Sequence, residues 1–309
     1  MASHSKLPTI IGEGGAPVPP ALTLREPMTT KYQGLTSAQR QHQYQEDRKL
    51  IRQAKKTQIS FMGCDLKIRM GVTVLGGCTG KGKSTCSANI LADFYTRYPD
   101  RQALVISNEE TSADVLDRIA CVLNKTDFYK YRDGGTPPAY EEMIEKCSGQ
   151  LLKRVEVVCN EGIDMTCLED VIDVLRYAKT QEHLKLVVLD YLQTVTWSKR
   201  FPLITAYEVS KKLGLFLKEY GKTANVPVIV FAQLKPAPES EGEWRPDMAD
   251  RVQGDRTFVN HAVMTIEIIP DFEESSTSFY IHKDRFGSTA GNSHNFDWKQ
   301  GRLIEQRVF

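Results

Sequence analysis

The sequence predicts an α/β fold in which helices cover both faces of a mostly parallel, twisted sheet, with a β-hairpin near the C-terminus. The first observation behind this prediction is a set of continuous apolar runs, such as residues 71–75, 184–189 and 226–231. Strands buried on both faces have this pattern, whereas strands with one solvated face alternate apolar and polar residues. The second observation is that segments with apolar residues at helical spacing lie between these runs.

The N-terminal part of the chain is predicted to lie outside this sheet. Residues 1–34 contain many glycines and prolines and few large apolar groups, which predicts a flexible arm. Residues 36–56 predict a polar helix that begins with Thr36 and Gln39 as a capping box. This helix is either a solvated approach to the domain or a surface that docks on a neighbouring subunit. We therefore expect an arm at 1–34, a polar linker helix and candidate subunit interlock at 35–56, and one α/β domain at 57–309.

Strands and helices alternate along the predicted α/β domain. The predicted strands are residues 71–75, 103–107, 155–159, 184–189, 226–231, 262–269, 278–282 and 295–298. The predicted helices are residues 84–95, 112–123, 167–178 and 207–220. The strands at 262–269 and 278–282 form the predicted C-terminal hairpin.

Composition excludes several classes of protein. A chain of 309 residues that is 41% hydrophobic and 26% charged is typical of a soluble globular protein. No apolar stretch is long enough to cross a membrane, and the N-terminus lacks a signal peptide, so we expect a cytoplasmic protein without membrane contact. The seven cysteines include no C-x-x-C pair, which indicates a reducing compartment and argues against a structural zinc site or zinc-ribbon module. Because the net charge is only +1, nucleic-acid contacts must come from local loops.

Residues 77–84 read G-C-T-G-K-G-K-S, which fits the phosphate-binding P-loop pattern G-x-x-x-x-G-K-[ST]. Its glycines allow the loop to fold around an anion with N–H groups pointing inward. The predicted strand before the loop and the predicted helix after it are the arrangement that binds phosphate. We expect ATP as the nucleotide, with Lys83 on its β- and γ-phosphates and Ser84 as a ligand of Mg²⁺. The predicted nucleotide-binding residues are Gly77, Cys78, Thr79, Gly80, Lys81, Gly82, Lys83, Ser84 and Thr85.

Polar side chains follow three of the other predicted strands. Asp190 ends the strand at 184–189 at the edge where such folds bind ligands, and it can hold Mg²⁺ in the Walker B role. Glu109 follows the strand at 103–107, which we expect beside the P-loop strand, and can accept a proton from the attacking water. Its neighbour Glu110 is interpreted as favouring the start of the next helix. Gln233 can sense the γ-phosphate, although a satisfied buried glutamine is an alternative interpretation.

Several short motifs occur in a fixed order along the chain. They read S-N-E-E-T at 107–111, V-L-D-Y-L-Q at 188–193, V-P-V-I at 226–229 with A-Q-L at 232–234, R-P-D-M-A-D at 245–250, and K-D-R-F-G at 283–287. On these motifs the chain resembles the RecA-like motor domain of DnaB-type hexameric replicative helicases, including phage members, over about residues 57–291. The resemblance implies a RecA-like P-loop NTPase core and an ATP-dependent DNA helicase that acts in replication.

The resemblance also implies roles for particular residues. Arg285 would be an arginine finger, with Lys283 beside it, that reaches the γ-phosphate of a neighbouring subunit. The active form would then be a homo-oligomer, a hexameric ring, that moves 5′ to 3′ along single-stranded DNA. Its DNA-binding loops would fall at 197–200 and 235–256, where we single out Lys199, Arg200, Arg251, Gly254 and Arg256. Trp197 either stacks on a base or is buried.

The chain departs from the family pattern at three points. We expect a motor without the usual N-terminal collar or primase domain, so a separate primase or helicase loader is an expected partner. Ala232 stands where the family has a serine, and the loop V-Q-G-D-R at 252–256 is looser than the family's serine-glycine form. A phage-encoded chain would act in the host cytoplasm.

Two other functions stay open at this point. A RecA-like recombinase would form filaments and exchange strands, but the motifs at 188–193 and 283–287 weigh against it. A KaiC-like ATPase would act on protein partners, and its hydrolysis would be indifferent to DNA.

Overall fold

The central sheet of the protein carries the predicted site at one edge. The structure is a computed structural model that describes residues 36–56, 58–160, 163–223, 226–237, 246–299 and 301–306. Contacts divide the chain into two units, Met1–Arg48 and Lys49–Phe309. In the described part of the first unit, α1 (Ser37–Lys56) begins. The predicted capping box is confirmed, because the Thr36 N–H donates to Gln39 Oε1 at 2.8 Å and the Gln39 N–H donates to Thr36 Oγ1 at 3.2 Å. The predicted arm at 1–34 lies outside the described residues.

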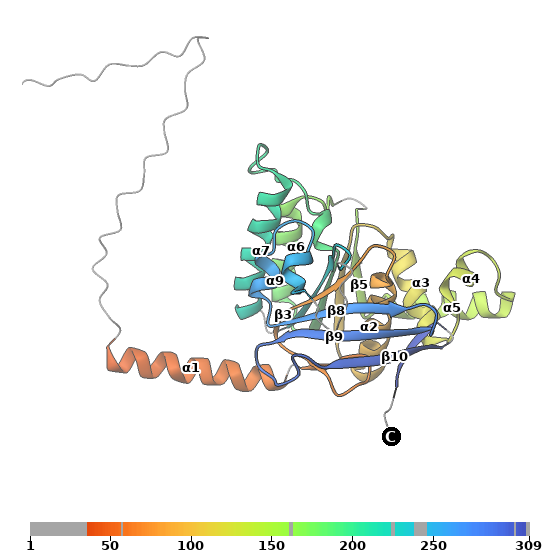
Figure 1. The fold of residues 1–309 in the computed structure, drawn as a ribbon, viewed down its shortest axis with the longest axis horizontal. Coiled ribbons are helices and arrows are strands. Elements are labelled where there is room, and N and C mark those ends of the chain that lie inside the picture. Colours follow the sequence, from red (N-terminus) through yellow and green to blue (C-terminus); the bar gives the residue numbers. More distant parts are fainter. Residues whose placement is uncertain are drawn as a thin grey trace, which may run out of the picture. The chain divides into compact units, whose positions relative to one another are not determined.

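In the second unit, nine of the described strands form one sheet in the order β11-β10-β9-β8-β3-β7-β6-β4-β5 (Figure 1). Six strands, from β8 to β5 in this order, are parallel. These are β3 (Gly71–Gly77), β4 (Gln102–Ser107), β5 (Val155–Val158), β6 (Leu184–Asp190), β7 (Pro227–Gln233) and β8 (Met264–Asp271). The other three, β9 (Ser276–Asp284), β10 (Ser293–Lys299) and β11 (Arg302–Glu305), continue the sheet antiparallel. The predicted α/β class is therefore confirmed.

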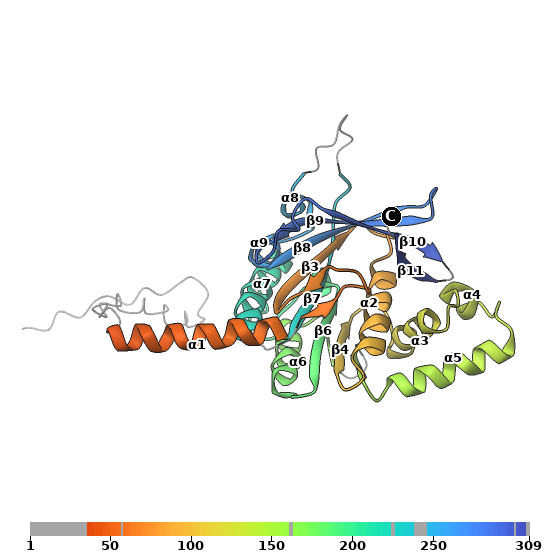
Figure 2. The ribbon, with the colours of Figure 1, turned by 90° about the horizontal axis from the view of Figure 1, so that it is seen from below.

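Helices cover both faces of this sheet (Figure 2). On one face lie α2 (Lys83–Arg97) and α3 (Ser112–Leu123), and α5 (Pro138–Leu151) packs on α3. On the other face lie α6 (Leu168–Thr180), α7 (Ala206–Thr223) and α9 (Thr257–His261). Strand β6 shows how the apolar runs serve both layers, because Leu186 and Val188 join the first core while Val187 and Leu189 join the second. Alternate side chains of a strand point to opposite faces, so a strand between two layers must be apolar throughout.

The structure adds elements that the sequence analysis did not predict. The predicted hairpin is present as β8 and β9, but β10 and β11 extend it into four antiparallel strands. Helix α5 was missed because only Ile144 and Leu151 of its side chains are buried, which leaves a weak apolar pattern. The remaining elements are β1 (Ile59–Ser60), β2 (Lys67–Ile68), α4 (Phe128–Arg132), the 3₁₀ turn η1 (Leu192–Thr194) and α8 (Met248–Arg251). Among the described residues, no helix is long and apolar enough to cross a membrane.

One predicted neighbour relationship is wrong. Strand β4, which leads to Glu109, does not lie beside the P-loop strand β3, because β7 and β6 come between them. Its parallel partners are β6 and β5. The error arises because order along the chain does not fix order in a doubly covered sheet, where a crossover can pass a strand position.

Candidate functional site

The P-loop joins the buried end of β3 to the first turn of α2. Gly80 and Gly82 have φ angles of +70° and +82°, and Gly82 is the N-cap of the helix. These angles favour glycine, so the loop can present its N–H groups to an anion. Gly77 has no such angle; a Cβ there would lie 3.3 Å from the Lys83 Cγ, so the glycine allows the lysine to cross the loop.

Lys83 points back across the loop. Its ammonium donates to the carbonyl oxygens of Gly77 at 3.4 Å and Cys78 at 3.2 Å. Burial lowers the pKa of Lys83, and the carboxylates of Asp190 and Glu109 partly offset this effect. The ammonium therefore lies in an electronegative, half-buried place, where phosphate oxygens would replace the two carbonyls as acceptors.

Asp190 lies at the end of β6 and is 7% exposed. Burial, together with the charges of Glu110 and Glu109, raises its pKa to about 7, while Lys83 and a hydrogen bond with Ser84 act in the opposite direction. Its Oδ1 is buried and has no hydrogen-bond partner among the described residues. An orphaned carboxylate oxygen beside the Ser84 hydroxyl fits a Mg²⁺ ion, which takes a few protein oxygens and keeps several waters.

The two glutamates after β4 have different partners. Glu109 is exposed on the cavity and accepts a hydrogen bond from the Tyr191 hydroxyl, whose pKa is raised by burial and by this carboxylate. Glu110 forms an ion pair with the largely buried Arg118. The predicted role of Glu110 at the helix start is wrong, because Thr111 is the N-cap of α3 and forms a capping box with Asp114.

Gln233, at the end of β7, reaches the P-loop. Its side-chain amide donates to the hydroxyl of Thr79, and its backbone N–H donates to Gln193 Oε1 at 3.1 Å. The Gln193 amide nitrogen in turn donates to the carbonyl oxygens of Gln233 at 3.3 Å and Gln253 at 3.0 Å. A side chain at the phosphate edge is thus connected to the segment that follows α8.

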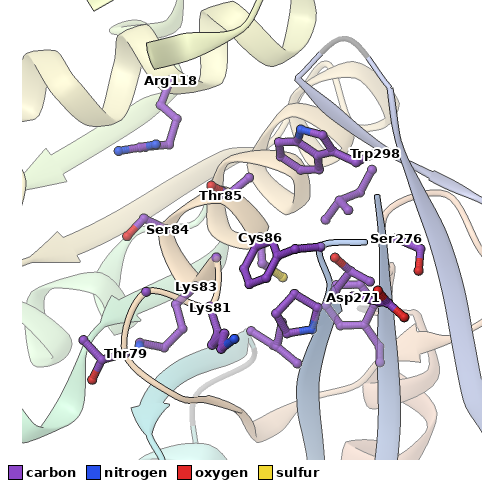
Figure 3. Close-up of a pocket in the computed structure, with 18 of the residues that line it drawn as sticks. Thr79, Lys81, Lys83, Ser84, Thr85, Cys86, Arg118, Asp271, Ser276 and Trp298 are labelled. Atoms are coloured by element: carbon purple, nitrogen blue, oxygen red, sulfur yellow. The ribbon is translucent and has the colours of Figure 1, made fainter. Parts of the chain in front are cut away.

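These residues surround one cavity of about 480 Å³ (Figure 3). The P-loop residues labelled from Thr79 to Thr85 form one wall, and Arg118 comes from α3. The opposite wall comes from the C-terminal strands and carries Asp271, Ser276 and Trp298. Glu109, Tyr191 and Gln233 also line the cavity. A nucleotide with its phosphates on the loop would extend toward the C-terminal strands.

Lys283 and Arg285 lie outside this cavity. Both donate to the carbonyl oxygen of Asn260, from 2.8 Å and 3.3 Å respectively, at the end of β9. Arg285 is exposed and Lys283 is half-buried, and burial lowers the pKa of Lys283 with help from Arg285. The chain therefore does not bring its own Lys283 and Arg285 to its own P-loop.

The structure contradicts one predicted DNA-binding residue and leaves the others exposed. Arg251 is 6% exposed and donates to Glu267 at 2.6 Å, so its guanidinium is not available to a phosphate. Arg256, Gly254 and Arg200 are exposed, and Arg256 lies 3.2 Å from Asp250. Lys199 is exposed but donates to both Asp170 oxygens at 2.7 Å.

Trp197 is 39% exposed, so the burial that the sequence analysis considered is wrong. Its ring nitrogen donates to Asp164 Oδ2 and Thr166 Oγ1, both at 3.0 Å. These bonds fix the edge of the indole on the segment before α6.

Three residues of the site were missed by the sequence analysis: Tyr191, Gln193 and Arg118. Tyr191 and Gln193 belong to the motif D-Y-L-Q, and their place directly after the buried strand was a usable signal, because the carboxyl ends of parallel strands form the ligand edge. Arg118 had no such signal, since it lies on a helix and its pairing with Glu110 is visible only in three dimensions.

The sheet order, the P-loop and the edge carboxylates define a P-loop nucleotide-binding protein with a RecA-like fold. The profile of the DnaB-like helicase C terminal domain matches residues 68–303, and the chain belongs to this family.

Relatives by sequence include the replicative DNA helicase DnaB of Mycoplasma genitalium, 22% identical over 245 residues, which are 75% of this chain and 52% of the relative. The DnaB of Geobacillus stearothermophilus is 27% identical over 187 residues, which are 59% of this chain and 39% of the relative. The chain therefore spans about half, or less, of the length of these relatives.

Two solved structures share the fold. One is an ATPase domain solved by itself, which superimposes with a TM-score of 0.63 at 12% identity, covering 77% of this chain and 85% of that one. The other is a DnaB-like replicative helicase, described with its interactions with primase, which gives a TM-score of 0.61 at 13% identity, covering 76% of this chain and 57% of the other. At these identities the likeness concerns the fold alone.

Proposed function

We propose that this chain is the ATP-hydrolysing motor of a replicative DNA helicase of the DnaB type, which moves along single-stranded DNA as a homo-oligomeric, hexameric ring. The observation that carries the proposal is the division of the catalytic groups. The P-loop, Glu109, Tyr191 and Gln233 line one cavity, whereas Lys283 and Arg285 of the same chain lie outside it. A site that needs an arginine finger is then completed only by a second subunit.

Within one subunit, the side chains divide the work of hydrolysis. Lys83 would leave the carbonyls of Gly77 and Cys78 and bind the β- and γ-phosphates. Ser84 and Asp190 would hold Mg²⁺, which neutralises charge on the phosphates when bound. Glu109, oriented by the Tyr191 hydroxyl, would position the attacking water and accept its proton.

The neighbouring subunit would supply the remaining positive charge. Arg285 is exposed, and a planar guanidinium suits the equatorial oxygens of the transferring phosphoryl group. Lys283 beside it would hold the same oxygens. Gln233, bonded to Thr79, would detect the γ-phosphate and pass its loss through Gln193 to the segment around Gln253.

For the contacts to DNA we retain Arg200, Gly254 and Arg256, with Lys199 as a weaker candidate because Asp170 already holds it. Single-stranded DNA would be bound through its phosphates, so binding should weaken steeply with salt. The direction of movement, 5′ to 3′, and a separate primase or loader as partner are part of the same proposal.

Hydrolysis of ATP with and without single-stranded DNA tests the proposal. The proteins are the wild type, Lys83→Ala, Arg285→Ala and an equimolar mixture of the two variants. Each variant alone should be nearly inactive, and the mixture should recover about a quarter of the sites, because random neighbours complete one site in four. Arg176→Ala, which removes an exposed arginine of α6, is the matched control.

Each outcome has a clear meaning. Stimulation of the wild type by DNA, together with recovery in the mixture, supports a motor whose subunits complete each other's sites. If DNA has no effect and Arg285→Ala hydrolyses ATP normally, the helicase proposal is wrong, and an ATPase that acts on protein partners becomes the better assignment. Strand exchange without unwinding would indicate a recombinase.

We also propose that the helix beginning at Ser37 connects neighbouring subunits. The helix starts at its capping box and is polar throughout, with no acidic residue in its first turn. Deletion of residues 1–56 should reduce the oligomeric mass in solution while the remaining chain stays folded. An unchanged mass would contradict the interlock.

A further inference from the structure

Three side chains of different chemistry meet at a place that the proposed ATPase does not use. The ligand atoms of Cys64, His294 and Glu305 all lie within 4.8 Å of one another. None of the three lines the nucleotide cavity. Cys64 is 2% exposed, and His294 and Glu305 are partly buried.

Cys64 is held by a tight turn between β1 and β2. The Cys64 N–H donates to the Phe61 carbonyl at 3.0 Å, and the Phe61 N–H donates to the Leu66 carbonyl at 2.9 Å. Met62 and Gly63 have φ angles of +46° and +84°, which close the turn. The Ser60 hydroxyl donates to the Cys64 carbonyl at 3.0 Å. The position of the thiol is therefore fixed by the backbone before any ligand binds.

The pairing of β10 and β11 brings the other two side chains together (Figure 2). Glu305 lies opposite Phe296, and His294 precedes Phe296 by two residues, so the three side chains share one face of the sheet. His294 Nδ1 is 3.5 Å from Glu305 Oε1. Phe61 packs edge-on against Phe296, with ring centroids 6.4 Å apart, and this contact places the β1–β2 turn on the same face.

The donor set matches one class of ion. Thiolate, imidazole and carboxylate together are typical ligands of Zn²⁺, which binds sulfur at about 2.3 Å and nitrogen or oxygen at about 2.0–2.2 Å. In a tetrahedron of that size the ligand atoms are about 3.5 Å apart. The nitrogen and oxygen of His294 and Glu305 already have this separation, so only the sulfur must approach.

The charges at this place also favour a cation. Burial, with the nearby Glu305 carboxylate, raises the pKa of the Cys64 thiol to about 11, and the backbone N–H of Leu66 acts in the opposite direction. An N–H group directed at a cysteine sulfur is the kind of outer contact that supports a metal-bound thiolate. In the metal-free chain the thiol instead donates to the Phe61 carbonyl at 2.8 Å.

We propose that Cys64, His294 and Glu305 bind one Zn²⁺ ion, with water in the fourth position, and so fasten the β1–β2 turn to the C-terminal strands. The lack of C-x-x-C pairs in the sequence excludes a zinc ribbon. It does not exclude a site whose ligands come from three distant segments.

The expected consequence is stabilisation of the edge that forms one wall of the nucleotide cavity. Trp298 and Leu303 line that cavity from the other end of the same β10–β11 face. The role of the ion is structural, so its binding does not depend on whether the chain is a helicase.

Cobalt substitution of the full chain, without nucleotide, tests the site directly. We expect one equivalent of Co²⁺ to produce a sulfur-to-cobalt charge-transfer band together with tetrahedral visible bands, and one equivalent of Zn²⁺ to abolish both. Free Zn²⁺ at 100 times its Kd should raise the Tm by roughly 5–10 °C.

Three variants decide the assignment. Cys64→Ser should lose the charge-transfer band, whereas Cys147→Ser, which removes a half-buried cysteine of α5, should keep it. Glu305→Gln replaces a partly exposed side chain with one of similar shape, so it should fold and bind at least about tenfold more weakly. If Co²⁺ gives no charge-transfer band, or if Glu305→Gln and Cys64→Ser bind like the wild type, the zinc site is wrong.

Discussion

Arg251 Nη1 lies 2.6 Å from Glu267 Oε1, and both side chains are 6% exposed. His282 Nε2 lies 2.8 Å from the other oxygen of the same carboxylate. Arg251 also donates from Nε to the Lys235 carbonyl at 3.2 Å. The segment around α8 is therefore anchored to β8 and to β9, one residue before Lys283.

Removing one member of this buried pair should destabilise the protein. In Arg251→Met, the Glu267 carboxylate keeps only His282 as a charged partner, and breaking a buried ion pair costs about 3–5 kcal/mol. Urea unfolding should show this loss as a lower midpoint. The control Arg256→Met removes a 64% exposed arginine and should change stability by no more than about 0.5 kcal/mol. Equal losses in both variants would contradict the burial of Arg251.

Gln193 should couple nucleotide state to the segment after α8. Gln193→Met keeps the length of the side chain but loses its bonds to Gln233 and to the Gln253 carbonyl. We expect ATP binding to persist while stimulation of hydrolysis by single-stranded DNA falls severalfold. The readout is the ratio of the rates with and without DNA, and Gln150→Met on exposed α5 is the matched control. An unchanged ratio would show that the amide is only a structural bridge.

Tyr191 should act as a positioning residue for Glu109. Tyr191→Phe keeps the ring and deletes the hydroxyl that donates to the Glu109 carboxylate. Hydrogen bonds to charged groups contribute about 1.5–3 kcal/mol, so kcat for ATP should fall about 10- to 100-fold. The KM should change much less, because the phosphates bind to the P-loop. The exposed Tyr177→Phe serves as control, and a wild-type kcat in Tyr191→Phe would rule out the positioning role.

The parts of the fold that could be predicted are those whose signal is local. Strand β6 is apolar on both faces and ends in Asp190, so its burial and its place at the ligand edge follow from the residues alone. The P-loop could be predicted for the same reason, since Gly80 and Gly82 take the conformations that glycine allows.

The parts that could not be predicted depend on pairing between distant segments. A basic residue in a polar stretch fits a DNA loop, and nothing near Arg251 in the sequence announces Glu267 or His282 beneath it. Likewise, the ligand atoms of Cys64, His294 and Glu305 converge only through the packing of Phe61 on Phe296. Local patterns define elements and edges, whereas partners of charged and polar side chains are set by the tertiary fold.

Asp190 should make the stability of the nucleotide-free protein depend on pH. Its pKa is raised by burial and by the neighbouring glutamates to about 7, above the unfolded value near 3.9. The folded state therefore binds the proton more tightly than the unfolded state, so the stabilisation is complete below about pH 4 and is lost as the pH rises through 7.

Between pH 5 and pH 8 the free energy of unfolding should fall by about 2–3 kcal/mol through this carboxyl alone. Asp190→Asn cannot ionise, so its unfolding should lack this component, and the variant should gain on the wild type as the pH rises. Urea unfolding of both proteins at several pH values, without nucleotide or Mg²⁺, measures the difference. Parallel pH profiles for the two proteins would mean that Asp190 is already ionised in the folded chain, and that Lys83 and Ser84 compensate its burial.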